Sequence, residues 1–217
     1  MLPVTEPAGR RVRTAALELF AERGFHGTGI RDLAQRAGVS TATLYHYMGT
    51  KEDLLAEIMR DSMRLLLRAA SPTGTGGTPT ERIARLTRIH VLAHAARPLH
   101  TRVADDELRA LSPGSRAEIT ALRDEYERFW QSAIDDGVST GEFRVQAPGV
   151  ARLALLEMCS GVARWYRPDG PLTAGELAAR YVEMALGLLT VDGIRLEPDP
   201  GAVGDMDRLV AELWPPS

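Results

Sequence analysis

The chain has 217 residues, a formal net charge of −3 and 44% hydrophobic residues. This composition is typical of a globular protein and excludes a disordered chain or a generally basic nucleic-acid binder. The charge is uneven, because residues 1–51 hold seven basic and four acidic residues and the remainder therefore carries −6. A positive N-terminal segment on an acidic body is expected of a phosphate-binding module joined to a domain of another kind.

Cysteine usage and hydropathy limit the cellular context. Cys159 is the only cysteine, which excludes an intrachain disulfide and a multi-cysteine metal site. No basic leader precedes an apolar core, so no signal peptide is expected. The most apolar stretch, residues 150–166, contains Arg152, Glu157 and Arg164 and is too short to cross a bilayer. We therefore expect a cytoplasmic protein with no membrane partner.

The first half of the chain reads as a series of helices. Apolar positions at helical spacing predict a helix from Pro7 to Gly24, and short helices over 30–37 and 41–47. Thr50 precedes Lys51-Glu52-Asp53, which resembles a capping box and begins a long helix to about residue 70. Residues 71–79 are rich in Gly, Thr and Pro and predict a loop.

The second half continues the helical pattern. Helices are predicted over about 80–96, 98–111, 113–137, 148–167 and 173–191, with a short helix near 203–213 in a tail rich in Pro, Gly and Asp. No alternating run of strand length is present in the sequence. The predicted fold class is all-α.

Residues 24–53 carry the functional signal. Two short helices joined by Ala37-Gly38-Val39-Ser40 are typical of a helix-turn-helix, because Gly38 permits the turn, Val39 fills the space between the helices and Ser40 can cap the second. Leu44 of the second helix is expected to face inward. Its outer residues offer hydroxyls and aromatic hydrogen-bonding groups, which suit base edges, thymine methyls and phosphates.

These residues resemble the TetR family of regulators. The match covers about residues 10–55 and rests on AERGFHGT, IRDLAQRAGVS and TATLYHYMGTKEDLL. The resemblance implies a three-helix DNA-binding domain whose matching helix enters the major groove of double-stranded DNA. Departures are Met48, where an aromatic residue is common, and Gly29, where Thr or Ser is frequent. The implied DNA contacts are Thr28, Thr41, Thr43, Tyr45, His46, Tyr47 and Lys51. The alternative is that Tyr45 and Tyr47 are core aromatics of a small bundle.

The last two long helices suggest how the protein dimerises. A single helix-turn-helix makes few base contacts, and a symmetric dimer solves this by reading two half-sites of a palindromic operator. The helix at 148–167 is apolar nearly all round, and Leu177, Tyr181, Met184, Ala185 and Leu188 line one face of the helix at 173–191. We expect a homodimer through these two helices, although 148–167 also fits an ordinary central core helix. The predicted domains are 8–53 for DNA binding, 54–191 for ligand binding and dimerisation, and a tail at 192–217.

Residues 113–190 resemble the subgroup of the family that answers to acyl-coenzyme A thioesters, on AEITALRDEYERFWQSAIDDGVSTGEF and ALLEMCSGVARWYRPDGPLTAGELAARYVEMAL. Such an effector needs an apolar tunnel for its acyl chain and cations for its phosphates. The tunnel candidates are Leu122, Tyr126, Trp130, Leu155, Met158, Cys159 and Trp165; the phosphate candidates are Arg123, Arg164 and Arg167. The alternative for each is plain core packing or a solvated arginine. Ligand binding would shift the dimer to a conformation unfit for DNA.

Two competing functions remain open at this stage. His90 and His94 lie four residues apart on a helix, with His100, Asp105 and Asp106 nearby. This spacing suits metal ligands, so a metal-responsive regulator is an alternative function. The segment HVLAH lacks the glutamate of a zinc-protease helix. An enzyme is the weaker alternative, because Ser160 lies in no nucleophile-elbow pattern and no cofactor fingerprint occurs. We expect no cofactor and no catalysis. The effector, the operator and the choice between repressor and activator stay open, with repressor favoured.

Overall fold

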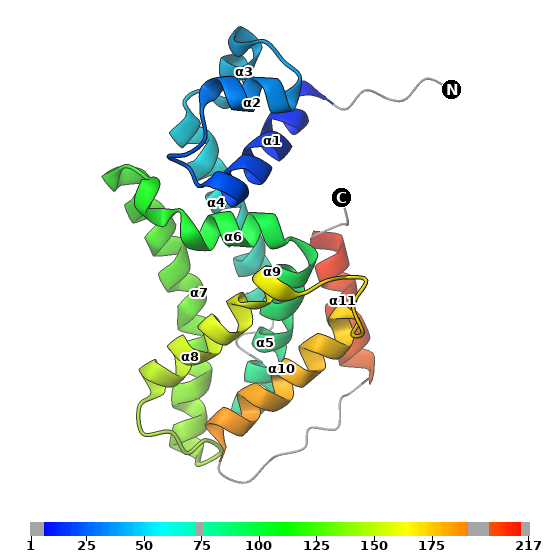
Figure 1. The fold of residues 1–217 in the computed structure, drawn as a ribbon. Coiled ribbons are helices and arrows are strands. Elements are labelled where there is room, and N and C mark those ends of the chain that lie inside the picture. Colours follow the sequence, from blue (N-terminus) through cyan, green and yellow to red (C-terminus); the bar gives the residue numbers. More distant parts are fainter. Residues whose placement is uncertain (1–6, 73–75, 191–199, 214–217) are drawn as a thin grey trace.

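The computed structural model describes residues 7–72, 76–190 and 200–213, and every regular element within them is helical (Figure 1). This confirms the all-α prediction. The predicted tail at 192–217 lies outside the described residues except for 200–213. Among the described helices, none combines the length and the apolar character needed to cross a bilayer.

The N-terminal head is a small bundle of helices α1 (Ala8–Arg23), α2 (Ile30–Ala37) and α3 (Thr41–Met48), closed by the first turns of α4 (Lys51–Ala70). Its core joins residues from each helix, including Phe20, Leu33, Leu44 and Leu55, all at most 1% exposed. Figure 1 shows the head at one end of the molecule, with α4 running from it into the body. A shift of α4 therefore moves the head relative to the body.

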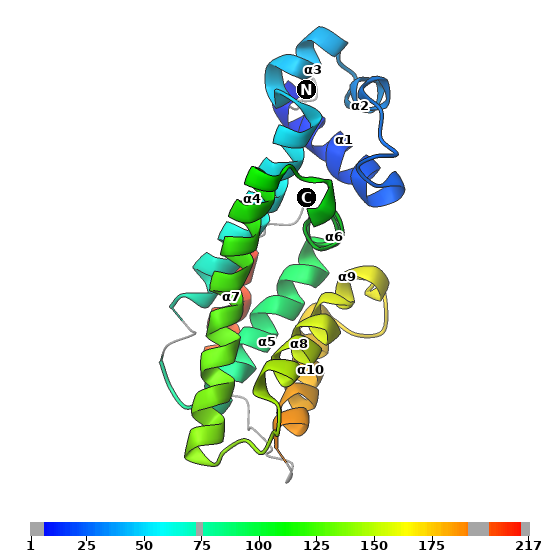
Figure 2. The same ribbon diagram turned by 90° about the vertical axis from the view of Figure 1, so that its left-hand side faces the viewer.

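The body contains the remaining helices, with α5 at its centre. They are α5 (Pro79–Ala96), α6 (Pro98–Asp106), the 3-10 turn Leu108–Ala110, α7 (Pro113–Thr140), α8 (Pro148–Ser160), α9 (Val162–Trp165), α10 (Ala174–Leu189) and α11 (Pro200–Leu213). Helix α5 contacts α4, α7, α8, α10 and α11. Its buried positions surround the helix rather than marking one stripe. Figure 2 shows α5 between α7 and the α8–α10 layer.

Four helix boundaries differ from the sequence predictions. The helix expected over 98–111 stops at Asp106, since three acidic residues in a row oppose the negative end of the helix dipole. The helix expected over 148–167 breaks at the Ser160-Gly161 pair, a common kink site. Gly137, expected to end α7, lies inside it, and the helix continues to a left-handed Gly141 with φ of 79°. The last helix begins at Pro200 rather than near residue 203.

Gly137 is kept inside α7 by tertiary packing. A Cβ atom at this position would overlap the ring of Phe143, which is 2% exposed. The lost helix propensity of glycine, about 1 kcal/mol, is offset by the approach of this aromatic ring. The glycine that reads as a stop signal is therefore a packing residue.

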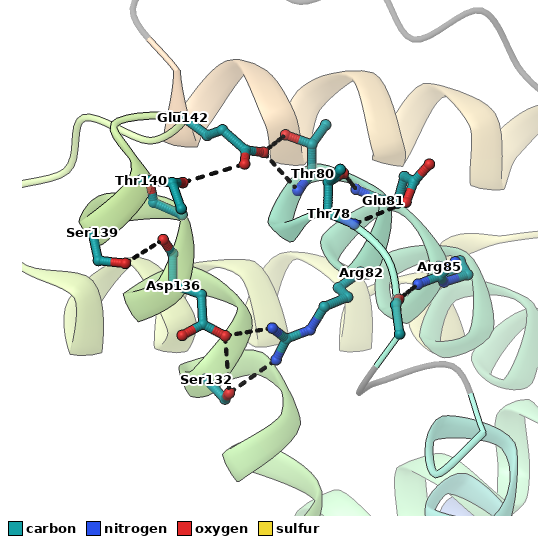
Figure 3. Close-up of polar contacts among 12 residues, drawn as sticks. Thr78, Thr80, Glu81, Arg82, Arg85, Ser132, Asp136, Ser139, Thr140 and Glu142 are labelled. Atoms are coloured by element: carbon teal, nitrogen blue, oxygen red, sulfur yellow. Dashed lines mark hydrogen bonds and ion pairs between the residues drawn. The ribbon is translucent and has the colours of Figure 1, made fainter.

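A polar cluster ties the start of α5 to the end of α7 (Figure 3). Arg82 is 7% exposed, and its guanidinium donates to Asp136 at 2.5 Å and to the Ser132 hydroxyl at 2.9 Å. Glu142 accepts a hydrogen bond of 2.8 Å from the Thr80 hydroxyl. The cluster lies at the end of the body away from the head (Figure 1). It supports the fold, since removal of Asp136 would take away the carboxylate that pairs with the buried guanidinium of Arg82.

Candidate nucleic-acid interface and effector region

Local capping fixes the turn between α2 and α3. Gly38 adopts a left-handed conformation with φ of 63° and ψ of 41°, which closes α2 and reverses the chain direction. The Ser40 hydroxyl accepts a hydrogen bond of 3.1 Å from the Thr43 amide and lies 2.8 Å from the Thr43 hydroxyl. Leu44 and Met48 are buried in the head and hold α3 on one side. The turn therefore has the geometry of a helix-turn-helix.

The opposite side of α3 faces solvent. Tyr45 and Tyr47 are 50% and 48% exposed, which rules out the alternative that both are core aromatics. Thr41 and His46 are exposed, and Thr43 is half-buried. The rings of His46 and Tyr47 meet edge to face at a centroid distance of 5.0 Å. The structure thus brings five of the seven predicted DNA-contacting residues onto one exposed helix.

Thr28 does not occupy the position expected for a phosphate contact. It is 1% exposed, and its hydroxyl donates to the carbonyl groups of Leu19 and Gly24 at 3.2 and 2.8 Å. Its side chain therefore fastens the loop between α1 and α2. The start of α2 is capped instead by Asp32, whose carboxylate accepts from the Gly29 amide at 3.2 Å.

Lys51 is bound to the same loop. Its ammonium donates to the carbonyls of Phe25 and Thr28 at 2.8 and 2.7 Å and lies 4.2 Å from the centroid of the Phe25 ring. Burial lowers the pKa of Lys51. An ammonium has three donors, so one hydrogen of this group is left for a phosphate. Lys51 therefore has a structural role in the head in addition to the predicted DNA contact. The sequence analysis did not predict this role.

The predicted effector residues fall into two groups. Tyr126, Trp130, Leu155 and Cys159 are buried together in the body core, and Leu122 and Met158 are half-buried against it. Burial raises the pKa of the Cys159 thiol to about 12. The structure therefore gathers six of the seven predicted tunnel residues at the body core.

The other predicted effector residues lie apart from that core. Trp165 is 52% exposed and stacks on Tyr181. Arg164 pairs with Asp106 at 2.7 Å, and the Arg123 guanidinium donates to the Ala104 carbonyl. Arg167 is exposed. These side chains do not converge, because Trp165 packs on α10 and two of the arginines bind α6.

His90 and His94 form a buried polar network rather than a metal site. Their rings stack at 4.1 Å. His90 contacts the Tyr126 hydroxyl through Nδ1 and the Ser160 hydroxyl through Nε2, each at 3.0 Å. His94 contacts the His90 carbonyl through Nδ1 at 2.8 Å and Asp105 through Nε2 at 3.4 Å. All four ring nitrogens thus face protein partners, and no three potential ligands cluster in the described part of the chain.

Burial governs the protonation of this network. Desolvation, and then the neighbouring His94, hold the pKa of His90 well below its usual value. Desolvation also raises the pKa of the Tyr126 hydroxyl. A neutral His90 can donate from one ring nitrogen and accept at the other. The sequence signal for the network is the four-residue spacing of the two histidines, a spacing that is also typical of a metal site.

A cleft of about 720 Å³ lies between α1, α4, α5 and α6 and contains none of the predicted effector residues. Its ionisable lining residues are Arg13, Asp61, Arg64, Arg68, Arg97 and His100. Sequence reasoning missed this site. The only signal was the pair Arg64 and Arg68, which lie one helical turn apart on α4.

An apolar surface covers the outer faces of α8 and α10. Val150 and Leu153 of α8 are 65% and 51% exposed, and Met184 and Leu188 of α10 are 47% and 44% exposed. The inner faces of both helices pack in the body core. Helix α8 is therefore not a central core helix, and the two predicted dimer helices each expose an apolar face. The prediction for α10 was wrong in part, because Leu177, Tyr181 and Ala185 are buried in the body core and only Met184 and Leu188 face outward.

Comparisons with known proteins cover both parts of the chain. Residues 12–58 match the family model described as bacterial regulatory proteins, tetR family. Residues 76–189 match the model described as tetracyclin repressor-like, C-terminal domain. The HTH-type transcriptional repressor KstR2 of Rhodococcus jostii (strain RHA1) is 30% identical over 188 residues, which cover 82% of this chain and 90% of that relative.

Solved structures show the same arrangement. The ketosteroid transcriptional regulator KstR2 of Mycobacterium tuberculosis matches with a TM-score of 0.78 and 26% identity, over 87% of this chain and 97% of that one. The regulator AibR, solved in complex with isovaleryl coenzyme A and operator DNA, matches with a TM-score of 0.72 and 28% identity, over 82% of this chain and 97% of that one.

Proposed function

Because the chain belongs to the TetR family of bacterial regulatory proteins, whose members bind operator DNA as dimers, we propose that it is a repressor released from a palindromic operator by an acyl-coenzyme A thioester. The main support for DNA binding is the exposed face of α3, whose opposite face buries Leu44 and Met48 in the head. We propose a DNA-binding domain over 8–53 and a ligand-binding and dimerisation domain over 54–191.

The DNA contacts that we propose lie on α3 and beside it. Thr41, Thr43, Tyr45, His46 and Tyr47 offer hydroxyl and imidazole groups to base edges and phosphates. Lys51 adds one ammonium hydrogen that the loop carbonyls leave available. Thr28 takes part only indirectly, because its hydroxyl holds the loop that positions Lys51.

The dimer that we propose buries the apolar faces of α8 and α10 against their copies. An isologous four-helix interface removes Val150, Leu153, Met184 and Leu188 from water in both subunits. Figure 1 shows α8 and α10 side by side on one flank of the body, which lets a partner cover both. The dimer fixes the separation of the two recognition helices and hence the half-site spacing.

The effector half rests on two observations. AibR, a structural relative, was solved with isovaleryl coenzyme A and operator DNA. In this chain the body core combines apolar walls from Trp130 and Leu155 with the polar groups of His90, Tyr126 and Ser160. Such a mixture suits an acyl chain with a thioester carbonyl. Entry of the acyl chain requires these packed side chains to separate, which would couple binding to a change of conformation.

We propose binding rather than catalysis at this core. Ser160 and His90 lie 3.0 Å apart, as a nucleophile and its base do. The other nitrogen of His90, however, faces the Tyr126 phenol, whereas hydrolytic triads place a carboxylate there. A protein of this kind acts on chromosomal DNA in the cytoplasm.

The test is fluorescence anisotropy of labelled DNA from the upstream region of the protein's own gene. Specific, salt-sensitive binding that weakens when one half of the palindrome is scrambled supports the regulator. Release by octanoyl coenzyme A, with free coenzyme A as the control, supports the effector. An operator affinity that octanoyl coenzyme A does not change would refute the proposed effector. Equal affinity for unrelated DNA would refute a specific operator.

A further inference from the structure

The cleft between α1, α4, α5 and α6 lies where the head meets the body, because its lining residues come from both. Its volume of about 720 Å³ falls within the range of about 300–1,000 Å³ that small-molecule sites occupy. Arg13 comes from α1 of the head, whereas the other lining residues come from α4, α5, α6 and the junction at Arg97. A molecule bound here would contact both parts of the protein.

The cleft is strongly basic. Arg13, Arg64, Arg68 and Arg97 line it, and Asp61 is the one acidic residue among its lining residues in the described part of the chain. Arg13 is compensated, because its guanidinium pairs with Asp61 at 2.8 Å and with Glu57 at 3.1 Å. The other cationic lining residues are Arg64, Arg68 and Arg97.

Arg64 and Arg68 lie one turn apart in the C-terminal part of α4. Both are exposed, and neither forms an ion pair with a residue that the structure describes. Like charges four residues apart on a helix repel each other. Arg68 lies in the last turn of α4, where a cation interacts favourably with the helix dipole, and Arg64 lowers the pKa of Glu118. Both guanidiniums are still exposed beside the cleft, and two arginines over one cleft are well suited to bind a phosphate group.

His100 lies beside two further arginines of the cleft. Its pKa is lowered to about 4, first by burial and then by the guanidiniums of Arg97 and Arg13, against the opposing effect of Asp61. The imidazole is therefore neutral at pH 7 and adds no positive charge to the cleft. The cations available to an anion are the arginines.

The floor of the cleft is apolar. Leu65, Leu66 and Ala93 line it, while Ser62 and Thr101 add hydroxyl groups. We propose that the cleft binds a phosphorylated small molecule that also carries an apolar or aromatic part, the chemistry shared by the nucleotide end of coenzyme A and by free nucleotides. Arg64 and Arg68 hold the phosphates, and the leucines contact the rest of the ligand.

The site has a regulatory consequence. A ligand held between Arg13 of α1 and Arg68 of α4 contacts the head and the body together, so its affinity depends on the angle between them. Where the ligand is coenzyme A, this inference rests on the proposed function and locates part of the same effector. A free nucleotide would instead be a second signal.

The experiment measures binding by isothermal titration calorimetry on the full chain at pH 7 and low salt. The ligands are free coenzyme A and adenosine 3′,5′-bisphosphate. The test variant is Arg64→Gln with Arg68→Gln, and the matched control is Arg128→Gln with Arg144→Gln, two exposed arginines elsewhere on the body. We expect at least one ligand to bind the wild type and the control alike, and to bind the test variant at least tenfold more weakly.

Two results would overturn the proposal: neither ligand binds the wild type, or the test variant binds as the wild type does. Thermal unfolding checks that the exposed substitutions leave the fold intact. Competition between the bisphosphate and octanoyl coenzyme A identifies the cleft as part of the thioester site, and simultaneous binding identifies a separate nucleotide site. A mixed result separates the two proposals. If octanoyl coenzyme A fails to release operator, but coenzyme A or the bisphosphate still binds and the Arg64→Gln, Arg68→Gln variant binds it more weakly, the proposed effector is refuted and the ligand site in the cleft is supported.

Discussion

The guanidinium of Arg102 donates a hydrogen bond of 3.0 Å to the carbonyl of Ala21, which joins α6 of the body to the last turns of α1 in the head. Helix α6 is also bound to the body by the contact of Asp105 with His94 at 3.4 Å and by the pair of Asp106 with Arg164 at 2.7 Å. A change at the histidine network therefore reaches α6 directly, and it reaches the head through the packing of α6 on α1 and through this hydrogen bond.

Substitution of Arg102 by alanine should weaken the coupling between effector and operator. One hydrogen bond contributes about 0.5–1.5 kcal/mol, so we expect the ratio of operator affinities without and with octanoyl coenzyme A to fall roughly 2–10-fold. Anisotropy titrations measure both affinities. The control is Arg116→Ala, which removes hydrogen bonds to the carbonyls of Arg109 and Leu111 within the body. Equal ratios for Arg102→Ala and the wild type would show that this bond carries no coupling.

Substitutions on the exposed face of α3 should weaken operator binding without destabilising the head. We expect Tyr47→Phe and His46→Ala each to reduce operator affinity by about 1–3 kcal/mol, or roughly 5–150-fold, because each removes a polar group available for a base or phosphate contact. Anisotropy measures the affinity and circular dichroism the melting temperature. Gln146→Ala, at an exposed position of the body, should change neither. Full operator affinity in both α3 variants would contradict the proposed interface.

Charges on the apolar surface of α8 and α10 should separate the subunits. The double substitution Leu153→Glu and Leu188→Glu places four carboxylates in a dimer interface, whose burial is costly. We expect a monomer by light scattering and loss of specific operator binding. Val138→Glu introduces the same charge at an exposed apolar residue of α7 and should leave the dimer intact. A dimeric double variant would place the interface elsewhere.

Stability should fall as the pH decreases from 7.5 to 5. The folded pKa of His100 is about 4 against an ordinary value of 6.5, so the unfolded chain binds a proton in this range that the folded chain does not. Buried His90 acts in the same direction. Urea unfolding should show a smaller pH dependence for His100→Gln than for the wild type. The same dependence in both proteins would mean that His100 is protonated in the fold.

The helices and the DNA-binding face could be predicted because their signals are local. The caps at Ser40 and Thr50 and the inward Leu44 depend on residues a few positions apart. Gly137 shows where local rules fail, since it reads as a helix end until Phe143, on the following segment, is seen to pack on it. Thr28 is a second case, because its hydroxyl donates to the carbonyls of Leu19 and Gly24 and is not directed at a phosphate.

The sites in the body depend on contacts between distant segments. The His90 network joins residues 36 and 70 positions away, Tyr126 and Ser160. The cleft brings Arg13 together with residues of α4, α5 and α6. No spacing rule in the sequence predicts such meetings. Two of the three predicted phosphate-binding arginines, Arg123 and Arg164, bind α6 instead. The sequence analysis did not identify the arginines that line the cleft.

The central claim is that operator and thioester bind in opposition. Thermodynamic linkage requires each ligand to lower the affinity for the other by the same factor, roughly 5–150-fold for couplings of about 1–3 kcal/mol. The most direct test is calorimetric titration of octanoyl coenzyme A into the free dimer and into the dimer saturated with operator. We predict weaker thioester binding to the operator complex, by the factor that anisotropy gives for operator release. Equal thioester affinity in the two states would contradict the account.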